Sequence, residues 1–292
     1  MAALKYLLLF CWLGLAQAEP MPAAAREPWE VRDAQLQAGL QAVVEQLGLA
    51  TAVKDGRLAL AIMDVTQPKQ PAYADLNGDR MYYAASLPKI AILLGAFAKA
   101  RDLGSMPAPV YETAYRMIRY SNNQAATETL AWVGNAYLLQ LLESPELRLY
   151  DRQRNGGLWV GRAYANTQPT FMRDPLHDTS HGANVLQIVR FWHLLAQGRL
   201  LSQEVSRQMK EMMGNPYFNN KFVLGLRKHP ALCIYRKTGT FQDNHGDGAL
   251  IETVVDGQVT RRFILAGLAH DKAGGEWLQR LADPLYELLL RR

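Results

Sequence analysis

The chain has 292 residues, of which 49% are hydrophobic and 20% charged, and its formal net charge is +5. This composition is ordinary for a soluble globular protein with a substantial core. The basic residues form no stripe interleaved with aromatic side chains, so the sequence gives no support for a nucleic-acid partner.

The first 18 residues have the pattern of a secretory signal peptide. Lys5 supplies a positive charge, residues 7–15 are apolar, and Ala16-Gln17-Ala18 forms a small-x-small cleavage site. The apolar run is shorter than the ~20 residues of a membrane span, and no other stretch approaches that length. We therefore expect a periplasmic or secreted mature chain, residues 19–292, without a stable membrane anchor. Cys233 is then the one mature thiol, and we expect it to be buried in a strand.

The mature sequence predicts a helix, two strands, a helical block, three strands and a final helix. The expected helices are Trp29–Leu47, Ile90–Ala100, Ala108–Glu146 (interrupted near Ser121), Ala183–Gln197, Ser202–Met213 and Glu276–Leu290. The expected strands are Leu58–Val65, Ala72–Leu76, Leu232–Thr240, Gly248–Val255 and Arg262–Ala269, while 151–173 has the composition of a loop.

This order predicts an α+β fold. Both groups of strands would join into one five-stranded antiparallel sheet, flanked by the N-terminal and C-terminal helices, beside a helical lobe. Within a single domain over 19–292, the α/β lobe would comprise 29–80 and 230–292, and the helical lobe 81–229.

Ser86 and Lys89 form an S-x-x-K motif at the start of a nearly all-apolar helix. A spacing of three places both side chains on one helix face. Burial would disfavour the ammonium form and lower the pKa of Lys89, so that a neutral amine could take the proton of the Ser86 hydroxyl. The alternative is a surface helix that Ser86 merely caps.

Two further motifs follow along the chain. Ser121-Asn122-Asn123 interrupts a helical stretch, where asparagine side chains can bind local backbone or point into a cleft. Lys237-Thr238-Gly239-Thr240 ends a predicted strand, where Lys237 would supply a cation and Gly239 would allow a substrate to approach closely. The amides of Thr240 and Ser86 could then face a developing oxyanion. Each motif alone could be a capping turn or a strand end, but their order indicates one joint site.

Together the three motifs resemble those of class A serine β-lactamases and their relatives in the penicillin-recognising serine hydrolase superfamily. The stretch 118–126 is similar to the family's second motif and the helix after it, and 177–180 resembles the family's Arg-Asp-Thr-Thr segment. The resemblance covers nearly the whole mature chain. It implies that Ser86 is the acylated nucleophile, Lys89 its base, Ser121 a proton shuttle, and Lys237 a partner of Ser121 and of the substrate carboxylate. It assigns substrate binding to Asn123, Thr238, Gly239 and Thr240.

The chain departs from the family pattern in the loop before that segment. Class A enzymes carry a glutamate there that activates the deacylating water, whereas this chain has no carboxylate between Asp151 and Asp174. Tyr164 or Asn166 falls near the expected position, and neither is a convincing base. The residues needed for acylation are therefore present, while hydrolysis of the acyl-enzyme is expected to be weak.

Other departures concern the walls of the site. Only 35 positions separate Ser86 from Ser121, fewer than in class A, so we expect a more open cleft. Asp247 lies near the position where class A enzymes often have a carboxylate-binding arginine, and acidic residues there would repel an anionic substrate. Arg162 and Asp178 could form the ion pair that closes the loop neck in the family.

Histidines give a rival hypothesis of a metal site. His177 and His181 are four positions apart, which on a helix could bind zinc, and His245 lies near the predicted cleft rim. No HExxH motif is present and the segment around Thr179 is typical of a loop or helix start, so we expect ordinary histidines, no metal and no cofactor.

We therefore expect an exported serine hydrolase that opens the amide of a β-lactam through a Ser86 ester. The alternatives are a D-alanyl-D-alanine peptidase or penicillin-binding protein that acts on a murein peptide, and a non-hydrolytic binding or sensor domain. The sequence leaves the oligomeric state open.

Overall fold

The computed structural model describes residues 26–165 and 171–292. The signal peptide predicted for 1–18 and the candidate position Asn166 lie outside these ranges. Of the helices described, none combines the length and the apolar character that a membrane crossing requires.

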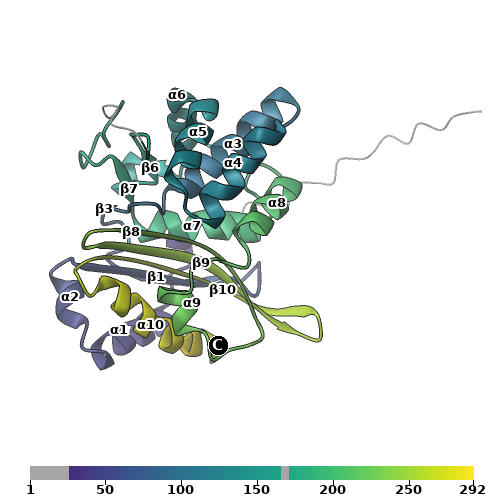
Figure 1. Cartoon of the computed structure of the whole chain (residues 1–292). Coiled ribbons are helices and arrows are strands. Elements are labelled where there is room, and N and C mark those ends of the chain that lie inside the picture. Colours follow the sequence, from purple (N-terminus) through teal and green to yellow (C-terminus); the bar gives the residue numbers. More distant parts are fainter. Residues whose placement is uncertain (1–25, 166–170) are drawn as a thin grey trace, which may run out of the picture.

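A five-stranded antiparallel sheet forms the centre of the molecule, in the order β2-β1-β10-β9-β8 (Figure 1). Its strands are β1 (Leu58–Asp64), β2 (Ala72–Leu76), β8 (Leu232–Phe241), β9 (Asn244–Val255) and β10 (Gln258–His270). The pairing of β1 with β10 joins the two distant groups of strands, as predicted. Successive side chains of β1 enter opposite layers, as the period of two requires; Leu58, Leu60 and Ile62 face one core, and Ala59, Ala61 and Met63 face the other.

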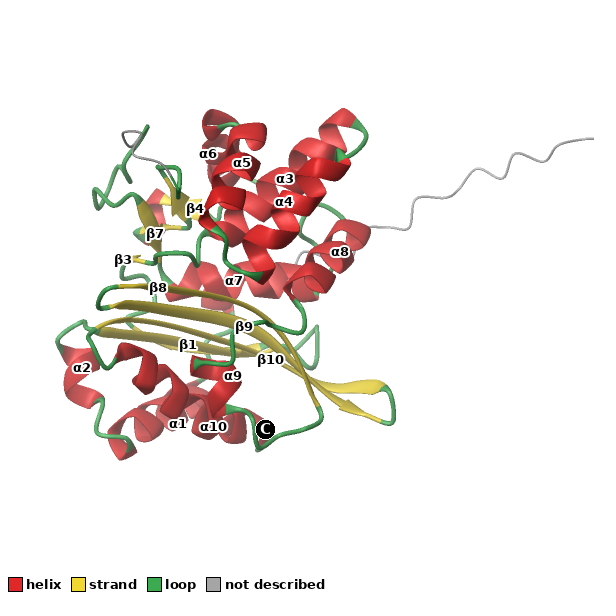
Figure 2. Ribbon diagram, viewed as in Figure 1, coloured by secondary structure: helices red, strands yellow, loops and turns green. Residues whose placement is uncertain are grey.

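The terminal helices cover one face of the sheet (Figure 2). This layer holds α1 (Ala34–Gln46), α2 (Ala50–Lys54), α9 (Lys221–Gly225) and α10 (Gly274–Leu290). The helix predicted from Trp29 begins later, because a 3-10 turn at Pro28–Glu30 comes first and Asp33 then caps α1 by accepting a hydrogen bond from the Leu36 amide.

The other face carries the helical lobe (Figure 1). Its helices are α3 (Lys89–Leu103), α4 (Ala108–Arg119), α5 (Asn123–Val133), α6 (Asn135–Glu143), α7 (Val185–Ala196) and α8 (Gln203–Met213). α3 is buried nearly all round, and Gly104 ends it in the left-handed conformation that favours glycine. α7 lies between the sheet and the rest of the lobe, in contact with both.

Short strands replace part of the loop predicted over 151–173. They are β4 (Tyr150–Asp151), β5 (Gly156–Gly157) and β6 (Trp159–Val160), with the 3-10 turn Arg152–Arg154 between the first two. β6 pairs with β7 (His181–Ala183), which pairs with β3 (Tyr82–Tyr83). This small sheet places the segment before Ser86 beside His181.

Cys233 lies in a strand, as predicted, but the prediction that it is buried is wrong. Its side chain is exposed, because it lies near the start of β8, the edge strand of the central sheet.

Candidate active site

Ser86 lies in the turn between β3 and α3, three residues before the helix begins at Lys89. Ala85 adopts a left-handed conformation (φ 50°), and the turn is closed by a hydrogen bond from the Leu87 amide to the Ala84 carbonyl. Ser86 is partly exposed. The helix start favours negative charge on its oxygen, as expected for a nucleophile.

Gly239 packs directly against this turn. A Cβ atom at position 239 would lie 2.9 Å from the Ser86 amide nitrogen and 2.8 Å from that of Leu87, and it would overlap the Ala84 carbonyl oxygen. The K-T-G strand therefore approaches the Ser86 turn so closely that only glycine fits at position 239.

Lys89 is completely buried, and its ammonium group points toward the second motif. Nζ donates to the backbone carbonyl of Ser121 (2.6 Å) and to Oδ1 of Asn123 (2.7 Å). Burial lowers the pKa of Lys89 from 10.5 to about 7. A large fraction of this lysine is therefore the neutral amine near neutral pH, as the sequence predicted.

Ser121 joins the two lysines of the site. It adopts a left-handed conformation (φ 52°) between α4 and α5. Its hydroxyl accepts a hydrogen bond from Lys237 Nζ (2.9 Å), which also donates to the Thr238 carbonyl (2.7 Å). Burial, reinforced by the nearby charge of Lys89, lowers the pKa of Lys237 well below its usual value.

A further lysine, which the sequence analysis missed, holds the K-T-G strand. Buried Lys221 lies within hydrogen-bond distance of four oxygens: Thr238 Oγ1 (2.9 Å), Thr240 Oγ1 (2.9 Å) and the carbonyls of Gly239 (2.6 Å) and Gly246 (3.0 Å). Burial lowers the pKa of Lys221 to about 8. Both threonine hydroxyls assigned to substrate binding are thus fixed by this cation.

Asp247 does not repel a substrate, contrary to the prediction. It is fully buried, and Nε and Nη2 of Arg236 each donate to one of its carboxylate oxygens at 2.7 Å. The amide of Phe222 donates to it as well (3.1 Å). Its charge is therefore neutralised inside the protein, and Arg236 is a second residue that the sequence analysis missed.

Tyr164, one of the two residues near the expected position of the loop glutamate, covers Lys89. Its ring centroid lies 4.5 Å from Lys89 Nζ, and its hydroxyl donates to the Ala85 carbonyl (3.1 Å). The backbone amide of Tyr164 donates to Thr127 Oγ1 (3.1 Å), which ties the loop to α5. Burial raises the pKa of the Tyr164 phenol well above 10, so it remains a hydrogen-bond donor and cannot act as a base.

His177 lies in a turn and His181 in strand β7, so the two histidines do not share the helix that the rival metal hypothesis required. Nε2 of His181 is 3.0 Å from the Arg162 carbonyl and Nδ1 is 3.2 Å from Ser180 Oγ, and burial lowers its pKa to about 4. His181 is therefore a neutral ring with both nitrogens satisfied. His177 bonds instead to Asn155.

The proposed pair of Arg162 and Asp178 is replaced by a different one. Asp178 lies 3.6 Å from Arg173, on the exposed part of the loop. Within 26–165 and 171–292, the one cluster with the proximity of metal ligands is His229, Asp283 and Glu287, at α10 on the other side of the sheet from the helical lobe.

Comparisons with known proteins place this geometry in context. Residues 103–289 match the sequence model of the Beta-lactamase enzyme family. Among curated proteins, none matches the chain.

Many solved structures share the fold. A class A β-lactamase from Bacteroides cellulosilyticus DSM 14838 has a TM-score of 0.66 at 12% identity, over 89% of this chain and 100% of that one. The β-lactamase from Sphaerobacter thermophilus DSM 20745 has a TM-score of 0.64 at 16% identity, covering 88% and 95% of the two chains. An L158E mutant of PBP-A, in an acyl-enzyme complex with penicillin G, has a TM-score of 0.65 at 18% identity, covering 89% and 98%. The fold therefore agrees with the family match, and the chain belongs to the β-lactamase enzyme family.

Proposed function

We propose that this chain is an exported serine hydrolase that opens β-lactam amides through an ester on Ser86 and hydrolyses that ester slowly. The observation that carries the proposal is the burial and hydrogen bonding of Lys89. A neutral lysine has two N–H bonds and one lone pair, and the two bonds match its two acceptors, the Ser121 carbonyl and Asn123 Oδ1. The lone pair is then left to accept the proton of the Ser86 hydroxyl.

These positions support the following reaction. As Lys89 takes the proton, Ser86 Oγ forms a bond to the β-lactam carbonyl carbon, and collapse of the tetrahedral intermediate breaks the amide C–N bond. The Ser121 hydroxyl gives a proton to the leaving nitrogen and is reprotonated by the proton that Lys89 took from Ser86, so no net proton is gained or lost. Lys237 Nζ, 2.9 Å from that hydroxyl, is in place to bind the substrate carboxylate.

Slow hydrolysis is supported by the residue that covers Lys89. Tyr164 donates its hydroxyl to the Ala85 carbonyl, and its raised pKa prevents it from removing a proton from water. A general base contributes about 10²–10⁴ to a rate, and the acyl-enzyme must do without one at this position.

The same observation favours a second candidate, a penicillin-binding protein or D-alanyl-D-alanine peptidase, because a β-lactam adduct that persists is characteristic of such proteins. The L158E mutant of PBP-A, which shares this fold, forms an acyl-enzyme with penicillin G. A third candidate is a sensor that binds a β-lactam or murein peptide without turnover.

The test is the intact mass of the protein over time after mixing with penicillin G or a carbapenem, beside the loss of substrate absorbance. We expect a Ser86 adduct that forms in both cases and decays slowly while substrate is consumed. A permanent stoichiometric adduct would favour the penicillin-binding protein, and release of D-alanine from a peptide would identify the peptidase. Ser86→Ala must abolish the adduct; absence of an adduct in the unsubstituted protein would refute the proposal.

The proposal that the protein is exported rests on the signal-peptide pattern of residues 1–18. The supporting result would be a secreted or periplasmic product whose mass corresponds to a chain that begins at Glu19.

A further inference from the structure

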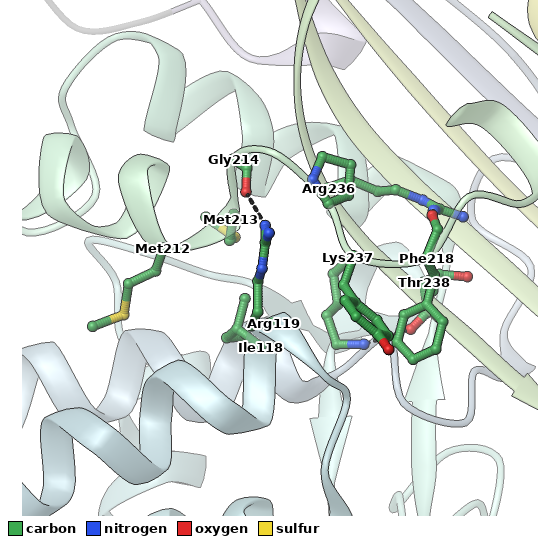
Figure 3. Close-up of a pocket in the computed structure, with 11 residues that line it drawn as sticks. Ile118, Arg119, Met212, Met213, Gly214, Phe218, Arg236, Lys237 and Thr238 are labelled. Carbon is green, nitrogen blue, oxygen red and sulfur yellow. Dashed lines mark hydrogen bonds between the residues drawn. The ribbon is translucent and has the colours of Figure 1, made fainter. Parts of the chain in front are cut away.

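Two exposed tyrosines, here called the aromatic wall, stand beside the position proposed for the substrate carboxylate. Tyr120 directly precedes Ser121 and is 46% exposed, and Tyr217 is 61% exposed. Their ring centroids are 5.1 Å apart, with an angle of 79° between the rings. Tyr217 also lines a cavity of about 20 Å³. Lys237 and Thr238, which Figure 3 labels, line the same cavity. A cavity of this volume holds about one water molecule. A ligand would therefore not enter it and would contact the outer faces of the two tyrosine rings instead.

The loop that carries Tyr217 is fixed at both ends by arginines. Arg119 Nη1 donates to the Gly214 carbonyl (3.1 Å), as Figure 3 shows. Arg236 Nη1 donates to the Phe218 carbonyl (2.7 Å). One arginine lies two residues before the second motif and the other immediately before the K-T-G motif. The aromatic wall is therefore held in register with the two motifs, and little ordering is needed when a ligand binds.

Neighbouring rings support the two exposed ones. Tyr115 packs edge-on against Tyr120 at 6.4 Å, and Phe218 packs edge-on against Tyr217 at 5.3 Å. Tyr115 in turn packs against the core of the helical lobe. The outer partners thus anchor the row, while the middle rings keep accessible faces on which a planar group can stack.

We propose that the aromatic wall selects substrates by the group beside their carboxylate. This inference rests on the proposed function, since it is a carboxylate on Lys237 and Ser121 that sets the position of the substrate. In a cephalosporin the carboxylate and the 3-substituent are on adjacent ring carbons. A carboxylate at Lys237 therefore brings the 3-substituent to Tyr120 and Tyr217, where an aromatic substituent gains a stacking contact that a methyl group cannot make.

The test compares two cephalosporins that share one acylamino group, one with an aromatic 3-substituent and one with a 3-methyl group. The rate of Ser86 acylation is measured by intact mass in the unsubstituted protein, in Tyr217→Ala and in Tyr217→Phe. We expect the ratio of the two rates to fall about fivefold to tenfold in Tyr217→Ala and to be retained in Tyr217→Phe, since a ring contact of this kind contributes up to about one factor of ten. Because every variant is tested with the same two compounds, the difference in their intrinsic reactivity cancels when the rate ratios of the variants are compared.

A matched control is Tyr111→Ala, which removes a tyrosine of similar exposure (48%) at the other end of α4 and must leave the ratio unchanged. The rate with the methyl compound reports whether Tyr217→Ala still folds around an intact Ser86 site. An unchanged ratio in Tyr217→Ala with that rate preserved, or a ratio lost in Tyr217→Phe as well, overturns the role of the aromatic wall alone. Absence of a Ser86 adduct with both compounds in the unsubstituted protein overturns the proposed function and the wall with it.

Discussion

The pH dependence of acylation follows directly from the burial of Lys89. Because its pKa is lowered to about 7, the neutral amine makes up about one-eleventh of the lysine at pH 6 and about ten-elevenths at pH 8. If this amine removes the proton of Ser86, the second-order acylation rate constant must rise about tenfold between these values and level off above pH 8. A solvent-exposed lysine, with a pKa near 10.4, would give a rate that still rises at pH 9.

The effect of Lys89 on the pH profile can be distinguished from the effects of the titratable groups around it. His181 has its pKa lowered to about 4 and stays neutral over the whole range. The Tyr164 phenol stays protonated. Lys237 also has a lowered pKa, and its loss of charge would weaken carboxylate binding; a falling limb from this cause should disappear in Lys237→Arg, which keeps the positive charge.

The assay is quenched-flow intact mass with penicillin G from pH 5.5 to 9, with circular dichroism at each pH to verify that the protein stays folded. Lys89→Met should lower acylation by about 10²–10⁴, the usual contribution of a general base. Lys99→Met is the matched control, because Lys99 lies on the same helix, donates to the carbonyls of Trp132 and Val133 and lies over the Trp132 ring, yet has no part in the site. A rate that is flat across the range, or a midpoint above pH 9, would refute the assignment of Lys89 as the base.

Two further predictions concern the cover of the site and its buried charge. Tyr164→Glu places a carboxylate beside Lys89, so the Ser86 adduct should decay at least about tenfold faster by intact mass; an unchanged lifetime, with acylation intact, would show that a base at this position is not what hydrolysis lacks. Asp247→Ala leaves Arg236 buried without a counter-charge, which typically costs about 3–5 kcal/mol, so calorimetry should show a fall in Tm of about 10 °C. Glu204→Ala, which breaks an exposed ion pair with Arg207, should leave the Tm unchanged, and equal effects of the two substitutions would contradict the account of Asp247.

The parts of the site that were predicted from sequence are those set by local geometry. The three-residue spacing of Ser86 and Lys89, within an apolar run, was enough to predict a buried lysine near the nucleophile, and Lys89 is completely buried. The sheet was predictable for a similar reason, since short apolar runs separated by turn residues have few ways to pair. The strand ends were less predictable: β9 begins at Asn244 and β10 at Gln258, where polar residues continue the hydrogen-bonded ladder.

What the sequence did not predict depends on contacts across strands and between distant segments. Lys221 is one of 32 basic residues and carries no local pattern that distinguishes it; only the fold brings it under the K-T-G strand. Arg236 and Asp247 could have been paired from a correct hairpin register. Asp247 is opposite Thr238, and Arg236, two residues earlier on the same strand, is on the same face and diagonal to it. Asp247, which was expected from the sequence to repel an anionic substrate, is thus one partner of a buried ion pair.

That pairing also leaves more basic than acidic side chains buried around the K-T-G strand. Lys89, Lys221, Arg236 and Lys237 are all buried around the K-T-G strand, and Asp247 neutralises only Arg236 at close range. Burial lowers the pKa of all three lysines, and the charges of neighbouring basic residues lower it further at Lys221 and Lys237. A substrate carboxylate at Lys237 would supply the missing negative charge, which favours the charged form of that lysine. If Lys237 binds the anion as proposed, the anion would keep that lysine charged. Lys89, whose Nζ contacts the Ser121 carbonyl rather than the Ser121 hydroxyl, would then remain available as the proposed base.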